Sequence, residues 1–229
     1  RVKPIFEAVA AKADGDPCVT FLGPGSAGHY VKMVHNGIEY GLMQLLAETY
    51  DVMRRCLGLT NERLADVYEE WNRGELQSFL VDITGTVFRQ LDDVTGKHLI
   101  DLILDRARQK GTGKWTSQDA MDLQVPVPTI DSAVSMRDMS GYKDQREIAA
   151  RQLSGPDNRT AGGEITVQAI RKAFYGAMIV TYAQGMALLR TASDAYGYGL
   201  RLHDVARIWR EGCIIRARLL DDKIGRAHV

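Results

Sequence analysis

A long stretch of helical spacing, from Ala27 to about Leu57, most constrains how this chain can fold. Its apolar side chains recur at intervals of three and four residues, at Val31, Val34, Ile38, Leu42, Leu45 and Cys56. This spacing predicts one α-helix of about eight turns. An uninterrupted helix of that length leaves no room for a second β-strand soon after the glycine run that precedes it. The chain therefore cannot complete a strand–helix–strand unit at this point.

Most of the remaining pattern is helical as well. Residues 2–12 look like a short helix with Pro4 in its first turn, and a helix start is indicated at Thr60. Helical patterns also occur over residues 98–109, 165–196 and 202–220. We expect a mainly α-helical body.

Other segments predict different local structure. Residues 18–22 (CVTFL) form the one convincing β-prone run, and residues 78–88 fit a helix or a strand on periodicity alone. Residues 125–130 (VPVPTI) predict extended backbone, because each proline disfavours helix in the residue before it. Several breakers make residues 154–163 a loop. The whole pattern predicts a short βα segment followed by helices.

Composition restricts the class of protein. The 229 residues suffice for one large domain, or for one domain plus a fragment. Lysines and arginines number 29, as do the acidic residues, so the chain lacks the basic character of a nucleic-acid-binding protein. No apolar run approaches the roughly 18 residues that a membrane span needs. No apolar signal region opens the sequence.

The cysteines Cys18, Cys56 and Cys213 lie far apart in the sequence. Their odd number and wide spacing argue against a disulfide framework and against clustered metal ligands, and they favour a reducing compartment. We therefore expect a soluble cytoplasmic protein that binds no metal, no nucleic acid and no membrane.

Residues 23–28 (GPGSAG) fit the pattern G-x-G-x-x-G, which often binds the pyrophosphate of a dinucleotide. That function needs a strand before the loop, a helix after it, a second strand, and an acidic residue about 20 residues further on. The second strand is missing, and Pro24 removes a backbone donor between two glycines. We interpret the run as a joint between a strand and the long helix.

A polar stripe follows on the long helix. At about 100° per residue, one arc roughly 100° wide holds Lys32, His35, Asn36 and Glu39. A solvated face with a Lys–Glu pair would explain the same spacing. However, His and Asn are poor choices for an exposed helix surface, and Gly37 and Gly41 would permit close approach of a ligand or another backbone. An amine, an imidazole, an amide and a carboxyl group also make a plausible acid–base set.

Residues 108–116 (RQKGTGKWT) form a second candidate element. Its glycines let backbone N–H groups turn toward a ligand, and Lys110, Thr112 and Lys114 add charge and a hydroxyl, which suits a phosphate or carboxylate. A helix that ends at glycine, with cationic residues in its last turn, would give the same pattern. The spacing leaves both possibilities open, and Arg137 by itself is one more surface arginine.

Several blocks together resemble the 6-phosphogluconate dehydrogenase family: GHYVKMVHNGIEYG (28–41), WNRGELQSFL (71–80), QKGTGKWT (109–116), YAQGMALL (182–189) and IWREGCIIRA (208–217). Members of that family have an N-terminal NADP-binding Rossmann domain, a large all-helical domain and a C-terminal tail. The resemblance implies that residues 1–26 end the Rossmann domain. Residues 27–229 would then be an all-helical substrate-binding and dimerisation domain, incomplete at its C-terminus. The tail, which in the family supplies an arginine and a histidine to the neighbouring subunit, has no counterpart here.

The resemblance also implies a reaction in the pentose phosphate pathway. The family oxidises the 3-hydroxyl of 6-phosphogluconate and releases carbon dioxide, giving ribulose 5-phosphate and NADPH. By residue match, Lys32 would take the hydroxyl proton and then polarise the 3-keto intermediate, and Glu39 would protonate C1 of the enediol. The remaining matched positions would hold substrate: hydroxyls and carboxylate at His35 and Asn36, and phosphate at Tyr40, Lys110, Thr112 and Arg137. NADP would bind mostly outside this chain, and helical domains would form a homodimer.

Two other functions remain open. Another β-hydroxyacid dehydrogenase would explain Lys32 and Asn36 through the pattern G-x-x-G-x-x-x-K-x-x-x-N, but it would not explain His35, Glu39 and KGTGKW together. A non-catalytic helical dimerisation fragment is the alternative from a different class, because the chain lacks a cofactor domain and the residues that a partner donates. For the same reason we expect the fragment alone to be inactive.

Overall fold

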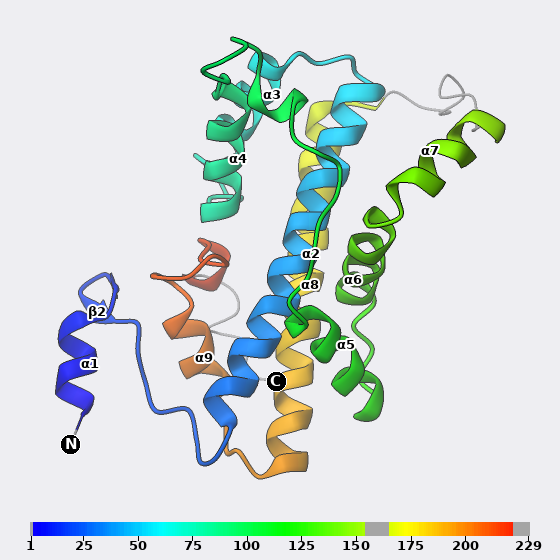
Figure 1. Ribbon diagram of the computed structural model, residues 1–229. Coiled ribbons are helices and arrows are strands. Elements are labelled where there is room, and N and C mark those ends of the chain that lie inside the picture. The colour runs from blue at the N-terminus through cyan, green and yellow to red at the C-terminus, as the bar shows by residue number, and fades with distance from the viewer. Residues whose placement is uncertain (1, 154–164, 222–229) are drawn as a thin grey trace.

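The computed structural model describes residues 2–153 and 165–221. Two long helices, α2 (Ala27–Arg55) and α8 (Val167–Tyr196), lie side by side and run in opposite directions through its centre (Figure 1). They confirm the helices predicted for residues 27–57 and 165–196, and the structure is mainly α-helical as expected. Within the described residues, no helix is both long enough and apolar enough to cross a membrane.

Glycines bring α2 and α8 close together. A Cβ atom on Gly41 would lie 2.6 Å from Cγ2 of Thr181, and a Cβ atom on Gly185 would lie 2.5 Å from Cδ1 of Ile38. Both distances are well inside van der Waals contact, and a close-packed interior accommodates such overlap only by moving its helices or side chains. The two glycines therefore let these helices approach as closely as they do.

Shorter helices cover the central pair. α3 (Asn61–Trp71) packs on α4 (Phe79–Arg89), so residues 78–88, which periodicity leaves ambiguous, are helical. On the other side of α2 lie α5 (Thr112–Asp122) and α6 (Pro128–Ser140), from which α7 (Lys143–Gln152) extends (Figure 1).

Hydroxyl side chains define two of these helix starts. Thr60 accepts a hydrogen bond from the backbone N–H of Arg63 at the start of α3, and Ser78 accepts one from Val81 at the start of α4. Each bond satisfies an N–H group that the first turn of a helix leaves unpaired. The helix start predicted at Thr60 is confirmed.

The N-terminal segment contains α1 (Lys3–Val9), as predicted for residues 2–12, and a small antiparallel hairpin of β1 (Lys12–Ala13) and β2 (Asp16–Pro17). The strand predicted for residues 18–22 is wrong, because this run is not paired as a strand in the described structure. A strand needs a neighbouring backbone to satisfy its N–H and C=O groups. Cys18 continues the hairpin by one bond, from its N–H to the carbonyl of Ala11 at 2.8 Å, but no described strand lies beside residues 19–22, and Phe21 is 85% exposed.

The helix predicted for residues 98–109 is also wrong. Only the 3₁₀ turn η1 (Leu99–Asp101) forms there, and the chain then runs irregularly to α5. Polar groups of α6 and its C-terminal end hold this backbone instead. The N–H of Ala107 donates to Oγ of Ser140 at 2.8 Å, and Arg137 donates to the carbonyl of Arg108 at 3.0 Å. Tertiary contacts thus override the local helical spacing.

The helix predicted for residues 202–220 ends early, at the last residue of α9 (Leu202–Ile208). Gly212 adopts a φ of +72°, which ordinary residues avoid, and a Cβ atom there would lie 2.7 Å from Cβ of Ala11. The chain then pairs with the start of α4, where the N–H of Phe79 donates to the carbonyl of Arg216 at 3.1 Å. The prediction missed this pairing because it joins segments far apart in sequence.

Two further sequence predictions concern residues 125–130 and residues 154–163. The extended backbone predicted for residues 125–130 is wrong for residues 128–130, because Pro128 occupies the first turn of α6. Proline suits that position because the first turn does not use its N–H. Residues 125–127 precede the helix, and Val127 has a φ of −127° and a ψ of 51°, which is not extended. The loop predicted for residues 154–163 lies outside the described residues.

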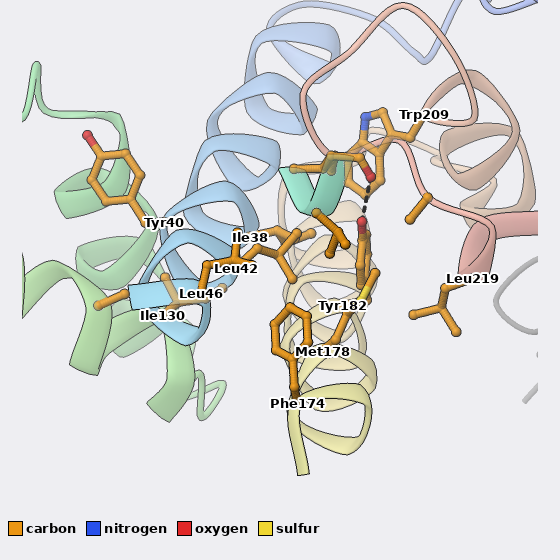
Figure 2. Close-up of a cluster of buried hydrophobic side chains, with 14 of the residues drawn as sticks. Ile38, Tyr40, Leu42, Leu46, Ile130, Phe174, Met178, Tyr182, Trp209 and Leu219 are labelled. Atoms are coloured by element: carbon orange, nitrogen blue, oxygen red, sulfur yellow. Dashed lines mark hydrogen bonds between the residues drawn. The ribbon is translucent and has the colours of Figure 1, made fainter. Parts of the chain in front are cut away.

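The core lies between α2, α8 and the segment that follows α9 (Figure 2). Tyr182 is fully buried in it, and its hydroxyl donates to the carbonyl of Ile215 at 2.5 Å, the dashed line in Figure 2. Phe174 and Met178 precede Tyr182 at helical spacing on the same side of α8. This bond fixes the segment after α9, which has little regular structure of its own.

We predict that Tyr182→Phe lowers the free energy of unfolding by about 1–3 kcal/mol, because it leaves a buried carbonyl without its donor. Urea denaturation followed by circular dichroism measures the change. Tyr50→Phe is the matched control, since the Tyr50 hydroxyl makes no hydrogen bond within the described part of the chain. Equal stability of the two variants would contradict this account of the core.

Candidate active site

A cavity of about 570 Å³ lies between the N-terminal segment and α2. Its walls come from α1, residues 18–22, the first turns of α2 and residues 208–214. Lys32 and His35 line it from α2, with Trp209 and Cys213 opposite. The volume is within the range of small-molecule sites. The cavity therefore gathers two residues of the predicted polar stripe.

His35 is held deep in this wall. Its side chain is 3% exposed, and its ring meets Trp209 edge-on, with centroids 5.8 Å apart. Nε2 of His35 lies 3.6 Å from Oε2 of Glu39, one turn further along α2. That separation is too long for a hydrogen bond, and Nε2 has no hydrogen-bond partner among the described residues. Buried polar atoms are normally paired, so Nε2 is an unusual buried nitrogen whose nearest charged neighbour is the Glu39 carboxylate.

Asn36 links α2 to the start of α5. Its Nδ2 donates to Oγ1 of Thr112 at 3.1 Å, whereas its Oδ1 is buried without a partner in the described structure. Lys32, by contrast, is exposed, and Glu39 is partly exposed. The predicted stripe is therefore divided: Lys32 and His35 line the cavity, Glu39 adjoins His35, and Asn36 contacts Thr112.

A second cluster forms around Tyr40, which Figure 2 shows directed away from the core of α2 and α8. A Cβ atom on Gly113 would lie 2.4 Å from the Tyr40 ring, so only glycine lets α5 approach this closely. The Arg137 guanidinium lies 4.0 Å from the centre of the same ring. Three of the predicted phosphate-binding residues, Tyr40, Thr112 and Arg137, thus stand on neighbouring elements.

Lys110, the fourth predicted phosphate-binding residue, is exposed just before α5. Gly111 follows Lys110 with a φ of +107°. Arg137 donates a hydrogen bond to the carbonyl of Arg108, two residues before Lys110. The start of α5 directs unpaired backbone N–H groups outward, and such a helix end favours anions. The cations and hydroxyls of this cluster have the same preference.

Trp209 and Cys213 were missed by the sequence reasoning, which assigned no chemistry to residues 208–219. Burial raises the pKa of the Cys213 thiol to about 11, while a hydrogen bond from the backbone of Ile215 and the nearby charge of Lys32 act in the opposite direction. Lys32 and Cys213 line the same cavity, from α2 and from the segment after α9. Gly212, which breaks the helical pattern, was the available signal that this segment turns back toward the body of the protein.

The described residues contain no group of three or more His, Cys, Asp or Glu side chains that could hold a metal ion. The glycine run 23–28 also does not suit a pyrophosphate. A Cβ atom on Gly23 would lie 2.3 Å from the carbonyl oxygen of Tyr198, so the turn packs against protein backbone. It joins residues 18–22 to α2, so the interpretation as a joint agrees with the structure for the helix but not for the strand, which does not form.

We predict that Cys213 reacts much more slowly with iodoacetamide at pH 8 than Cys56, which is exposed. With a pKa of about 11, only about one Cys213 thiol in a thousand is ionised at that pH. The Cys213 rate should therefore keep rising as the pH approaches 11. Peptide mapping by mass spectrometry measures both rates, and equally fast labelling of Cys213 at pH 8 would contradict this description of the cavity.

Comparisons with known proteins show which family this chain resembles. The profile of the 6-phosphogluconate dehydrogenase C-terminal domain matches residues 28–228. The NADP-dependent decarboxylating 6-phosphogluconate dehydrogenase of Bacillus subtilis is 51% identical over 229 residues, which cover 99% of this chain and 49% of that protein. The decarboxylating enzyme of Escherichia coli K12 is 52% identical over 221 residues, 96% of this chain and 47% of the enzyme.

A solved structure is also similar. The 6-phosphogluconate dehydrogenase of Plasmodium falciparum, studied in its apo form and with NADP⁺ and 6-phosphogluconate, superposes with a TM-score of 0.91 at 43% identity. The match covers 96% of this chain and 48% of that one, so the chain spans about half the length of the relatives it matches. Sequence and fold agree over nearly all of that half, and the chain belongs to the 6-phosphogluconate dehydrogenase family.

Proposed function

We propose that this chain supplies the catalytic helix and the substrate site for oxidative decarboxylation of 6-phosphogluconate to ribulose 5-phosphate and carbon dioxide, with NADP as the oxidant. The observation that carries the proposal is the pair of clusters along α2. One is the cavity with Lys32 and His35, and the other is the anion-type cluster around Tyr40 and Thr112. A sugar acid phosphate has matching chemistry, with hydroxyls and a carboxylate at one end and a phosphate at the other.

The proposed chemistry needs a base, an electron sink and an acid. Lys32 takes the proton of the 3-hydroxyl as that carbon is oxidised, and bound NADP supplies the hydride acceptor. The protonated Lys32 then polarises the 3-keto oxygen, which draws in the electrons of the breaking bond to the carboxylate. Glu39 finally protonates C1 of the enediol. Both groups stand on one helix, which holds them in fixed relation.

His35 and Asn36 are proposed to position the substrate. Both carry a buried polar atom that makes no hydrogen bond within the described structure, Nε2 of His35 and Oδ1 of Asn36. A substrate hydroxyl satisfies either atom. Leaving such groups unpaired costs free energy, so a ligand that pairs them gains affinity and orientation.

The phosphate is proposed to bind at Tyr40, Lys110, Thr112 and Arg137, beside the N-terminus of α5. Cations and hydroxyls from separate segments form charge-assisted hydrogen bonds with a dianion. The residues that hold NADP are proposed to lie mostly outside this chain, since the glycine run is packed against Tyr198. The apolar wall of the cavity, with Val31 and Trp209, suits the face of a flat ring beside Lys32.

We further propose a division of the chain at residue 26, between the end of a cofactor-binding domain and the helical domain. Ser26 immediately precedes α2, which supports the boundary. A homodimer through the helical domain is supported by exposed apolar side chains on α6 and α7, including Met136, Met139 and Ile148. A cytoplasmic location is proposed with it.

Calorimetry tests whether the chain prefers a phosphorylated substrate. We predict that 6-phosphogluconate binds the chain at least about 100-fold more tightly than gluconate, because two lost charge-assisted bonds cost about 3–6 kcal/mol together. Arg137→Met should remove most of that preference. Equal binding of the two ligands would contradict the phosphate site and favour another β-hydroxyacid dehydrogenase.

Kinetic measurements test whether Lys32 is the catalytic base. In a full-length enzyme that contains this chain, Lys32→Met should lower kcat by about 10²–10⁴-fold, the usual contribution of a positioned acid or base. Lys97→Met, which changes an exposed lysine outside the site, should leave kcat unchanged. Normal turnover by the Lys32 variant would remove this residue from the mechanism, and we expect no turnover from the isolated chain.

A further inference from the structure

α5 runs antiparallel to α2 along the stretch that carries the proposed catalytic residues (Figure 1). Gly113, at the start of α5, packs on Tyr40, and Thr116, one turn later, packs on Gly37. A Cβ atom on Gly37 would lie 2.6 Å from Cγ2 of Thr116, so the two backbones are as close as glycine allows. The hydroxyl of Thr116 also lies 2.9 Å from the carbonyl of Met33. α5 therefore lies against α2 without a gap.

Hydrogen bonds join the two helices at both ends of this contact. At the substrate end, Asn36 donates to Thr112 in the first turn of α5. At the opposite end, the hydroxyl of Tyr30 donates to Oδ2 of Asp119, near the end of α5. Lys32 lies between these two bonds on α2. The segment that carries the proposed base is thus held at both ends by α5.

Asp119 is the centre of a small tyrosine cluster. Its second oxygen, Oδ1, accepts a hydrogen bond from Tyr196 at 2.8 Å, at the end of α8. The ring of Tyr30 contacts the rings of Tyr196 and Tyr198, with centroids 5.8 and 5.6 Å away. Burial raises the pKa of Tyr30, and the bond to Asp119 raises the pKa of Tyr196 to about 12. Both phenols therefore remain protonated donors at neutral pH.

Tyr30 and Lys32 face opposite sides of α2. Two residues at about 100° each place them roughly 200° apart on the helix. The bond to Asp119 holds Tyr30 against α5 and therefore fixes the rotation of this turn of α2. The same turn carries Lys32 on its opposite side, where Lys32 lines the cavity. A small rotation of this turn would move the ammonium group relative to the anion cluster at the start of α5.

We propose that Asp119 is a positioning residue, which through Tyr30 sets the rotation and register of the first turns of α2 and so places Lys32 against the bound substrate. The inference rests on the proposed function, because Lys32 is the proposed base. Asp119 touches no reacting atom and lies two turns of α5 away from Thr112. Its loss should therefore affect the chemical step more than binding of the phosphate.

Two tyrosine variants provide a matched pair. Tyr30→Phe and Tyr196→Phe each remove one hydroxyl from the same carboxylate, but only Tyr30 belongs to α2. Hydrogen exchange of the chain, followed by mass spectrometry, should show amides of residues 27–40 exchanging about tenfold faster in Tyr30→Phe and in Asp119→Ala. Residues 79–89 of α4 should be unchanged. Tyr196→Phe should leave residues 27–40 within about twofold of the unsubstituted chain.

Kinetics of a full-length enzyme that contains this chain give the second readout. Tyr30→Phe should lower kcat about 10- to 100-fold, as expected for a displaced catalytic group, while KM for 6-phosphogluconate changes by less than about threefold. A purely structural role would instead raise exchange throughout the chain and leave kcat per folded site unchanged. If Asp119→Ala fails to fold, the tyrosine pair still decides the question.

The outcomes separate this inference from the proposed function. If the unsubstituted enzyme does not oxidise 6-phosphogluconate, the proposed function fails, and the exchange pattern alone decides whether Asp119 holds α2. If the enzyme is active but Tyr30→Phe and Tyr196→Phe behave alike in exchange and in kcat, the role of Asp119 is refuted. Faster exchange confined to residues 27–40, with a lower kcat at constant KM, supports it.

Discussion

The structure depends on how closely α2 can approach its neighbours. Gly41 and Gly185 permit the contact with α8, while Gly37 and Gly113 permit the contact with α5. Glycine weakens an isolated helix by about 1 kcal/mol relative to alanine, so its presence at such positions needs a reason. The reason is packing, since each missing Cβ is replaced by an atom of the neighbouring element. These contacts hold α2 as a rigid support for the polar residues on its other faces.

The long helices were predictable because their signals are local. The spacing of Val31, Val34 and Ile38 requires only one helical face, and Thr60 is a cap that acts within three residues. The failures at residues 18–22, 98–109 and 209–220 have a common cause. Two of the segments have backbone partners far away in sequence: the N–H of Ala107 donates to Ser140, and the carbonyl of Arg216 accepts from Phe79. Residues 18–22 lack the neighbouring strand that would pair with them in the described structure. Local periodicity carries no information about such partners.

The candidate site shows the same limit. Helical geometry alone brought Lys32, His35, Asn36 and Glu39 onto one side of a helix, but only the resemblance to a family connected them with Lys110, Thr112 and Arg137. Trp209, Cys213 and Asp119 were missed, because their proximity to α2 arises from the return of distant segments. The cavity with Lys32 and His35 and the cluster around Tyr40 both lie along α2, and the proposed function assigns them to the two ends of one substrate. A rigid element keeps an acid–base group and an anion site at a constant separation.

A crystal structure of the protein with bound 6-phosphogluconate tests the central claim most directly. The account predicts phosphate oxygens within about 3 Å of Thr112 Oγ1 and the Arg137 guanidinium, and the 3-hydroxyl within about 3 Å of Lys32 Nζ. Glu39 should then face C1, and Asp119 should still accept its bond from Tyr30. A ligand whose phosphate lies away from the start of α5, or whose 3-hydroxyl does not reach Lys32, would contradict the account.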